Sequence, residues 1–258
     1  MRVALLQVAS PDDESFADRQ ARVNDLVLTE RTLADADLLI LPELWAVGCF
    51  LFDRYRDAAE PFDGPSLALA RAWAARHDIH VHLGSFVEAD GDQMHNTAAV
   101  VAPSGEVLTK YRKIHLFGRD EARLMTPGDA LDTIALHDFD LSLATCYDLR
   151  FPELFRSMID AGANVTAVPA AWPKARHAHW QLFSTVRAVE EQMYVIACNA
   201  VGTQNSTVFG GGSRVVDPWG NVVAEADDTE GFTYADLDPA MPSRVRAGFP
   251  ALADRRWD

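Results

Sequence analysis

The sequence is poor in basic residues. Its 258 residues include 23 lysines and arginines against 38 aspartates and glutamates, so the formal net charge is −15. A protein that binds nucleic acid or an anionic membrane needs a basic face that attracts phosphate groups. The composition therefore disfavours nucleic acid and membranes as partners, while an acidic surface by itself indicates little more than solubility.

Cysteine is also rare. The three residues, Cys49, Cys146 and Cys198, are widely spaced, and no two of them form a CxxC pair. A disulfide framework normally requires an even number of cysteines in a short secreted chain. We therefore expect reduced thiols and a cytoplasmic location, with Cys49 and Cys198 as structural residues.

Long hydrophobic runs and low-complexity linkers are absent from the sequence. No apolar stretch is long enough to span a membrane, and the strand-like segment 2–8 is too short for the core of a secretory signal. Hydrophobic residues make up 48% of the chain, which is enough for a sizeable core. We expect a single domain over residues 1–258.

Several motifs that identify enzyme classes are missing. The sequence has no GxSxG elbow of serine hydrolases, and the glycine-rich run 209–213 lacks the Walker lysine and the GxGxxG spacing. His80 and His82 share one face of an expected strand, but two ligands do not make a metal site. His115 and His179 leave a papain-like Cys–His pair open, although neither has a matching local signature. The sequence indicates no metal and no organic cofactor.

The sequence alternates apolar strand patterns with helical ones, which is typical of an α/β fold. Turn residues at 102–106 predict a hairpin between two strands, and those around 217–221 predict a second hairpin within 208–226. The expected strands lie near 2–8, 37–41, 79–86, 96–102, 141–145, 164–168 and 193–198, and the expected helices near 17–34, 65–77, 153–161 and 176–191.

Cys146 stands at the end of an apolar run, 141–145, and just before a helical pattern. Pro152 suits the first position of that helix, and Gly162 can end it. A thiol near a helix N-terminus meets unpaired N–H groups, which favour thiolate and can stabilise an oxyanion. The plainer alternative is a small buried hydrophobic residue.

Two further segments carry charge at the ends of apolar strands. Glu43 follows the run 38–42, and Lys113 precedes an Ile-His-Leu-Phe segment at 114–117. A charged side chain in such a place is costly to bury unless it is paired. Together with Cys146, these residues form a set of glutamate, lysine and cysteine.

These segments resemble the three motifs of the nitrilase superfamily of carbon–nitrogen hydrolases, whose triad is Glu, Lys and Cys. The matching residues are 41–44 around the glutamate, 111–116 around the lysine and 146–152 around the cysteine. Further similarity lies at 179–180, 187–188 with 190, 198–199, 212–213 with 218 and 220, and 255–256. The resemblance covers nearly the whole chain and is greatest to the amidase or ω-amidase-like branch. It implies a four-layer αββα sandwich.

The resemblance also implies a mechanism of amide hydrolysis without a cofactor. Cys146 attacks the carbonyl carbon, and Glu43, expected to be half-buried, shuttles the thiol proton to the leaving amine. Lys113 and the backbone N–H of Tyr147 hold the oxyanion, ammonia leaves, and water hydrolyses the thioester. A second glutamate of the family, eight residues beyond the lysine, corresponds to Glu121, which would hold substrate and lysine in place. Its alternative is a solvated loop acid.

The residues after the nucleophile bear on the substrate. Nitrile-cleaving relatives commonly have Trp-Glu there, whereas Tyr147-Asp148 resembles amidases of small aliphatic or dicarboxylic acid amides. Trp172, Phe50 and Trp45 are expected to form a small apolar pocket, with core or dimer packing as the alternative.

Arg150, or else Arg176, is a candidate to bind a substrate carboxylate. An ion pair of Arg150 with Asp148 or Glu153 is the simpler interpretation.

Other functions and assemblies stay open at this point. They are an N-carbamoyl amidohydrolase or nitrilase of the same family, a thioester acyltransferase, and a non-catalytic scaffold. Relatives form dimers or larger homo-oligomers, and the tail 249–257, which includes Trp257, suits docking on a second subunit.

Overall fold

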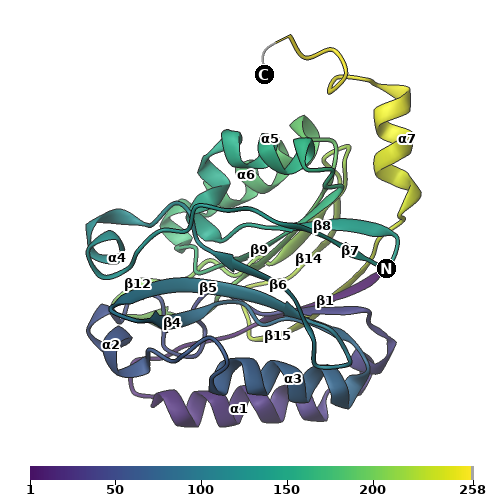
Figure 1. Ribbon diagram of the computed structural model, residues 1–258. Helices are drawn as coiled ribbons and strands as arrows, with labels where there is room; N and C mark the ends of the chain where they lie inside the picture. The colour runs from purple at the N-terminus through teal and green to yellow at the C-terminus, as the bar shows by residue number, and fades with distance from the viewer. Residues whose placement is uncertain (257–258) are drawn as a thin grey trace.

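Two β-sheets pack face to face in the computed structural model, which describes residues 1–256, and helices cover both outer faces (Figure 1). This arrangement confirms the expected four-layer αββα sandwich. Trp257, expected to dock on a second subunit, lies outside the described residues.

The first sheet has seven strands, and the N-terminal strand lies second from one edge. Its order is β15-β1-β2-β3-β5-β4, with β6 also pairing with β5. Strands β1, β2 and β3 run parallel, and β5 and β6 form the expected hairpin. The bounds are β1 Arg2–Gln7, β2 Leu38–Ile40, β3 His80–His82, β4 Phe86–Asp90, β5 Gln93–Val101, β6 Val107–Arg112 and β15 Gly231–Asp236.

The second sheet has six strands in the order β14-β13-β10-β9-β8-β7, and its three central strands run parallel. The hairpin expected around 217–221 joins β13 to β14. The bounds are β7 Thr133–Leu136, β8 Phe139–Leu143, β9 Val165–Ala170, β10 Tyr194–Asn199, β13 Arg214–Val216 and β14 Val222–Glu225, while β11 Thr203–Gln204 and β12 Thr207–Val208 pair separately.

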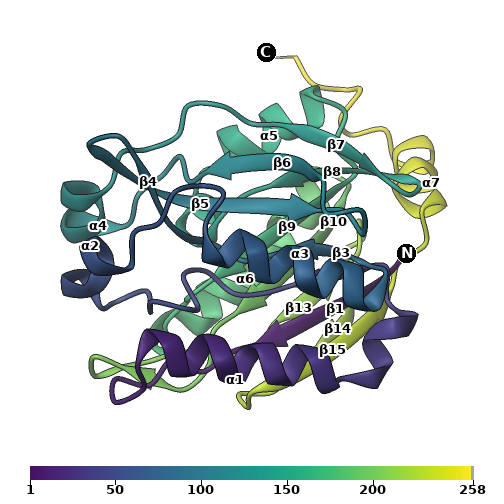
Figure 2. The same ribbon diagram turned by 60° about the horizontal axis from the view of Figure 1, so that its bottom comes forward.

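Helices α1 and α3 lie on the outer face of the first sheet, as Figure 2 shows from below, and α5 and α6 lie on the second. The bounds are α1 Phe16–Thr29, α2 Tyr55–Ala58, α3 Pro65–His77, α4 Gly118–Leu124, α5 Pro152–Asp160, α6 His177–Glu190 and α7 Ala240–Gly248. None of the helices within residues 1–256 is both long enough and apolar enough to cross a bilayer.

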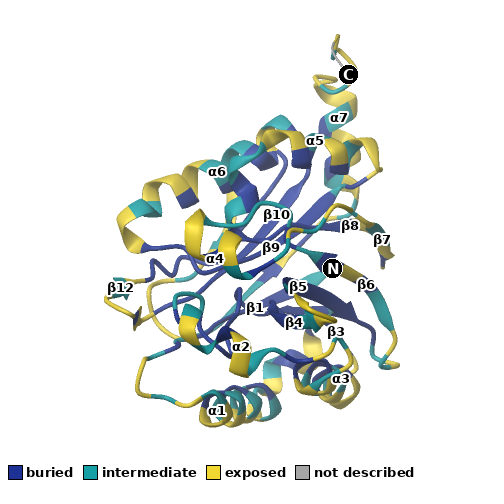
Figure 3. Cartoon of the chain, turned by 60° about the vertical axis from the view of Figure 1, so that its left-hand side comes forward, coloured by how far each residue is buried: buried dark blue, intermediate teal, exposed yellow. Residues whose placement is uncertain are grey.

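The alternation of side chains along each strand builds the layers. On β1, Val3 and Leu5 face the second sheet, whereas Ala4 and Leu6 pack under helices α1 and α3. Because both faces of the strand are covered, nearly the whole of it is apolar and buried (Figure 3). Both sheets are therefore fixed relative to each other at the strand ends that carry the candidate site.

The sequence pattern misplaced some boundaries. The helix expected near 17–34 ends at Thr29 and is followed by a 3₁₀ helix, Arg31–Asp35. The strand expected near 79–86 divides into β3 and β4, because Gly84 turns the chain with φ +75°. Strands β7 and β15 and helices α4 and α7 were not predicted, since their apolar periodicity is short or weak.

Candidate active site

The candidate residues come from both sheets and meet at one end of the sandwich. Glu43 follows β2 and Lys113 follows β6 in the first sheet, whereas Cys146 follows β8 in the second. Lys113 N–H still donates to Asn96 O at 2.9 Å, which extends the β5–β6 pairing as far as the lysine. The residues that follow parallel strands lie at the same edge of the sheet, so segments far apart in the sequence come together there.

Cys146 has a strained backbone at the sharp turn after β8. Its φ is +48°, a left-handed conformation that costs a non-glycine residue about 1–2 kcal/mol. It opens a 3₁₀ helix, Cys146–Arg150, and α5 begins only at Pro152. The helix start expected at the thiol is therefore that of the short 3₁₀ helix, while Pro152 does take the first turn of α5.

Glu43 and Lys113 form a buried ion pair. Lys113 Nζ donates to Glu43 Oε1 at 2.7 Å, and both side chains are almost completely excluded from solvent. Glu43 is 1% exposed and not half-buried as expected. Its other oxygen, Oε2, accepts the Ala171 N–H at 3.2 Å, which ties the carboxylate to the end of β9.

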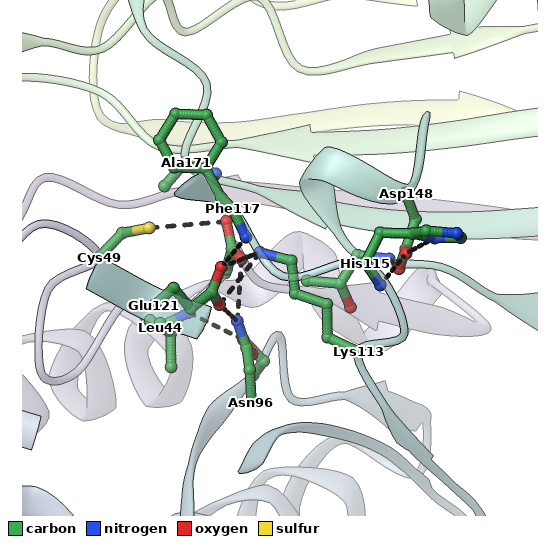
Figure 4. Close-up of polar contacts among 12 residues, drawn as sticks. Leu44, Cys49, Asn96, Lys113, His115, Phe117, Glu121, Asp148 and Ala171 are labelled. Atoms are coloured by element: carbon green, nitrogen blue, oxygen red, sulfur yellow. Dashed lines mark hydrogen bonds and ion pairs between the residues drawn. The ribbon is translucent and has the colours of Figure 1, made fainter. Parts of the chain in front are cut away.

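Glu121 joins the same cluster from helix α4 (Figure 4). Lys113 Nζ donates to its Oε2 at 2.9 Å and to its Oε1 at 3.1 Å. The Phe117 N–H, at the start of α4, donates to Oε2 at 2.5 Å. Glu121 is 3% exposed, so the alternative of a solvated loop acid is wrong.

Asn96 is a member of the cluster that the sequence did not reveal. Its Nδ2 donates to Glu43 Oε1 and to Glu121 Oε1, both at 2.9 Å, and thereby links the two carboxylates (Figure 4). The available signal was a polar amide at the start of the otherwise apolar strand 96–102. Strand position alone does not tell whether such an amide faces water or a buried charge.

Charges in the cluster raise the pKa values of both the lysine and the thiol. Burial alone would lower the pKa of Lys113, but the attraction of Glu121 and Glu43 outweighs it and raises that pKa well above 10.5. Burial and the negative charge of Glu43 raise the pKa of the Cys146 thiol well above 9.0. The expected thiolate is therefore wrong for the resting site, where the thiol keeps its proton and requires a base.

Hydrogen bonds to the side chain of Asp148 hold the loop that carries Cys146. This carboxylate is completely buried and accepts the Tyr111 hydroxyl at 2.7 Å and the Thr145 N–H at 2.8 Å. It also accepts the His115 N–H at 3.0 Å and lies 2.7 Å from the His115 ring nitrogen (Figure 4). Asp148 thus connects the lysine segment to the cysteine loop. Sequence reasoning missed this role.

Tyr147 is the second residue of the 3₁₀ helix that Cys146 opens. The first N–H groups of a helix lack carbonyl partners within it, so they remain able to bind an oxyanion beside the thiol. The Tyr147 ring lies against Phe117, with ring centres 5.3 Å apart, and lines the space above Cys146.

A small pocket opens directly onto the thiol. Phe50 and Trp172 line it, as expected, together with Phe117 and Tyr147. Trp45 does not, because it packs against Trp73 in the core. The lining residues are Glu43, Cys49, Phe50, Lys113, Phe117, Cys146, Tyr147, Arg150, Ala171, Trp172, Pro173 and Arg176.

Arg150 lies on aromatic rings at the pocket wall. Its guanidinium carbon is 4.8 Å from the centre of the Trp172 ring and 5.2 Å from that of Phe183. The simpler interpretation, an ion pair with Asp148 or Glu153, is wrong.

Arg176 lies on a second part of the same wall. Its guanidinium carbon is 5.6 Å from the centre of the Phe117 ring. Within residues 1–256, neither Arg150 nor Arg176 forms a salt bridge. Two cations therefore face the pocket without an acidic partner among the residues that the structure describes.

The two remaining cysteines differ in environment. Cys198 is buried between the sheets, with its sulfur 3.4 Å from Ile40 O and 3.5 Å from Leu6 O, in keeping with a structural residue. Cys49 is not purely structural, because it lines the pocket with its sulfur 3.7 Å from Glu43 Oε2. Among residues 1–256, no group of three His, Cys, Asp or Glu side chains is arranged to hold a metal ion.

Comparison with known proteins extends the similarity along nearly the whole chain. A family model described as carbon–nitrogen hydrolase matches residues 2–247, which include every site residue above. The 2-oxoglutaramate amidase of Paenarthrobacter nicotinovorans is 35% identical over 266 residues, which cover 99% of this chain and 90% of that protein.

Two solved structures share the fold. Saccharomyces cerevisiae Nit3, a member of branch 10 of the nitrilase superfamily, has a TM-score of 0.88 at 31% identity, covering 100% of this chain and 97% of Nit3. A mutant of the amidase from Nesterenkonia sp. AN1 has a TM-score of 0.86 at 30% identity, covering 99% of this chain and 94% of that one. That mutant carries the acetamide moiety of fluoroacetamide, added covalently at its active-site cysteine.

Proposed function

Because the chain belongs to the carbon–nitrogen hydrolase family and is a hydrolase that acts on amides, we propose that it cleaves the terminal amide of a small dicarboxylic acid monoamide through a thioester on Cys146. The observation that carries this proposal is the convergence of Cys146, Glu43 and Lys113 on one small pocket. The pocket supplies the three groups that amide cleavage requires: a nucleophile, a proton shuttle and a donor for the oxyanion.

Acylation begins with proton transfer. The Cys146 thiol is protonated at rest because burial and Glu43 raise its pKa, so Glu43 takes the proton as sulfur attacks the amide carbon. The carbonyl oxygen becomes an oxyanion, held by the Lys113 ammonium and the Tyr147 N–H. The C–N bond then breaks, Glu43 returns the proton to the leaving nitrogen, and ammonia departs from a Cys146 thioester.

Deacylation repeats these steps with water. Glu43 removes a proton from a water molecule that attacks the thioester carbon, and the same two donors hold the second oxyanion. The C–S bond breaks, the proton returns to the sulfur, and the carboxylic acid leaves. The full reaction consumes one water and needs no redox or group-transfer cofactor.

Glu121 and Asn96 keep the other groups in position. The two contacts from Lys113 Nζ to Glu121 fix the ammonium, and the raised pKa of Lys113 keeps it charged throughout. The Asn96 amide orients Glu43 through Oε1, so Oε2 remains the oxygen that exchanges protons. We assign both residues a positioning role, and Glu121 also contacts the lysine that acts on the substrate.

The charge of the pocket wall supports the substrate class. Arg150 and Arg176 face the pocket with no acidic partner within residues 1–256, and a guanidinium is well suited to bind a carboxylate. Phe50 and Trp172 provide apolar surface for the short chain between the two ends of the substrate. The relative from Paenarthrobacter nicotinovorans is a 2-oxoglutaramate amidase, and 2-oxoglutaramate is a monoamide of this kind.

Ammonia release from a panel of compounds tests the proposal. The panel contains 2-oxoglutaramate, succinamate, the uncharged amide butyramide, an N-carbamoyl amino acid and a nitrile. We expect the two charged monoamides to be the best substrates and all turnover to disappear in Cys146→Ala. Best turnover on the carbamoyl compound or the nitrile would refute the proposed substrate class, and turnover that persists in Cys146→Ala would refute the mechanism.

Arginine variants test the substrate carboxylate. Arg150→Met should lower kcat/KM for succinamate at least tenfold and leave butyramide nearly unchanged, because the loss of one charge-assisted contact removes about 1.5–3 kcal/mol. The matched control is Arg244→Met on α7, whose guanidinium is exposed and pairs with Asp238 at 2.5 Å. It should affect neither substrate.

A further inference from the structure

Cys49 lines the active-site pocket but takes no part in the mechanism above. It lies on the turn that follows Glu43, where the Gly48 N–H donates to Leu44 O at 2.7 Å. This turn brings the partly buried Cys49 back beside the carboxylate, with its sulfur 3.7 Å from Glu43 Oε2 (Figure 4). The thiol therefore contacts the general base directly.

The two oxygens of Glu43 have different partners. Oε1 accepts the Lys113 ammonium at 2.7 Å and the Asn96 amide at 2.9 Å. Among residues 1–256, the hydrogen bonds to Oε2 come from two neutral donors, the Ala171 N–H at 3.2 Å and the Cys49 thiol at 3.7 Å. A proton binds more readily to the oxygen without a cationic donor, so Cys49 is hydrogen-bonded to the oxygen that exchanges the proton.

Cys49 is fixed as a donor. Burial, with the negative charge of Glu43, raises the pKa of the Cys49 thiol well above 9.0, so it keeps its proton throughout turnover. Its backbone is held on both sides, because the Tyr55 hydroxyl donates to Cys49 O at 2.5 Å and the Phe50 N–H donates to Gln204 Oε1 at 2.8 Å. The sulfur therefore has little freedom to leave the carboxylate.

We propose that Cys49 is a positioning residue that donates a hydrogen bond from its thiol to Oε2 of Glu43 and thereby tunes Glu43 as the general base. This inference rests on the proposed role of Glu43. A donor to the ionised carboxylate stabilises the form that accepts the proton, so it extends activity to lower pH. A residue that only lined the pocket would alter substrate binding and leave the pH dependence in place.

The pH profile of kcat/KM separates these two roles. In Cys49→Ala the donor is lost, and the acid limb should move to higher pH by about half a unit, which is about a threefold loss on that limb. Cys49→Ser keeps a donor of similar size, so its acid limb should lie at or below the wild-type position. An unmoved limb in Cys49→Ala, or equal shifts in both variants, would overturn the proposal.

Alkylation of Cys146 supplies a readout that needs no turnover. The rate of carbamidomethylation by iodoacetamide, assigned to Cys146 by peptide mass spectrometry, is measured against pH in wild type, Cys49→Ala and Cys49→Ser. The acid limb of this rate should shift as that of kcat/KM does. If no amide is turned over and the limb still shifts, the proposed function fails and the role of Cys49 stands; if amides are turned over and neither limb shifts, only the role of Cys49 fails.

Cys198 provides the matched control. Its thiol is buried between the sheets and contacts backbone carbonyls, away from the pocket lining. Cys198→Ala makes the same chemical change as Cys49→Ala and should leave both acid limbs in place. A limb that moves equally in Cys198→Ala would contradict a specific contact between Cys49 and Glu43.

Discussion

Replacing Lys113 with methionine removes the one positive charge that lies between two buried carboxylates. The ammonium is 2.7 Å from Glu43 and 2.9 Å from Glu121, and all three side chains are at most 3% exposed. Removing one partner from a buried ion pair typically costs about 3–5 kcal/mol, because the remaining charge stays buried without compensation. We expect a loss in that range in the free energy of unfolding of Lys113→Met at pH 8.

The charges of the cluster determine how the stability cost of Lys113→Met depends on pH. Folding raises the pKa of Lys113 above its ordinary value of 10.5, so its contribution to stability is fully present at pH 8 and is lost only as pH rises beyond 10.5. In Lys113→Met, Glu43 and Glu121 still share the Asn96 amide, and like charges this close favour binding of a proton by one of them. The penalty should therefore shrink to below about 2 kcal/mol at pH 5.

Urea unfolding followed by tryptophan fluorescence measures both values. The matched control is Lys174→Met, because Lys174 is 3.1 Å from Asp228 in an ion pair with more than half of each side chain exposed. It should cost less than about 1 kcal/mol at either pH. The double variant Lys113→Met/Glu121→Gln should recover part of the stability lost at pH 8. An equal cost at pH 5 and pH 8, or a cost no larger than that of Lys174→Met, would refute the reasoning.

Three further substitutions test other parts of the structure. Asp148→Asn should lower kcat about tenfold or more with little change in KM, because an amide nitrogen cannot accept the hydrogen bonds that hold the cysteine loop. Steady-state assays measure both values, and an unchanged kcat would contradict this prediction. Glu191 is buried, which raises its pKa from 4.5 to about 7, so its ionisation costs stability increasingly as pH rises from 4.5 to 7. Glu191→Gln should therefore stabilise the fold by up to roughly 3 kcal/mol at pH 8 and have no effect at pH 4. Urea unfolding measures this difference, and equal effects at both pH values would count against the prediction. Gly84→Ala should lower stability by more than about 2 kcal/mol in thermal unfolding, because φ is +75° and a Cβ would stand 2.1 Å from Pro42 O; an unchanged melting temperature would be inconsistent with the turn.

The layers of the fold and the main site residues could be predicted because they depend on local patterns. An apolar run that ends in Glu43, Lys113 or Cys146 indicates both a strand and a charge or thiol at its end. The parallel arrangement then brings such ends together. The strong helical and strand periodicities on either side gave most elements to within a few residues.

The rest of the site depends on tertiary contacts that no local pattern contains. Asn96 contacts two carboxylates from segments far apart in the chain, and Cys49 reaches Glu43 only because of the turn at Gly48. The protonation of Cys146 was predicted with the wrong sign, because the dipole of a short 3₁₀ helix is outweighed by burial and by the neighbouring charge of Glu43. The burial of the thiol depends on how the two sheets pack together, which the local sequence does not show.

Direct detection of the acyl-enzyme tests the central claim. Wild type and Cys146→Ala are mixed with excess succinamate, quenched in acid after a few milliseconds to seconds, and examined by intact-protein and peptide mass spectrometry. The account predicts a succinyl adduct on the peptide that contains Cys146 in wild type, lost again as substrate is exhausted, and no adduct in Cys146→Ala. Turnover without any adduct at Cys146, or an adduct on Cys49 in its place, would contradict it.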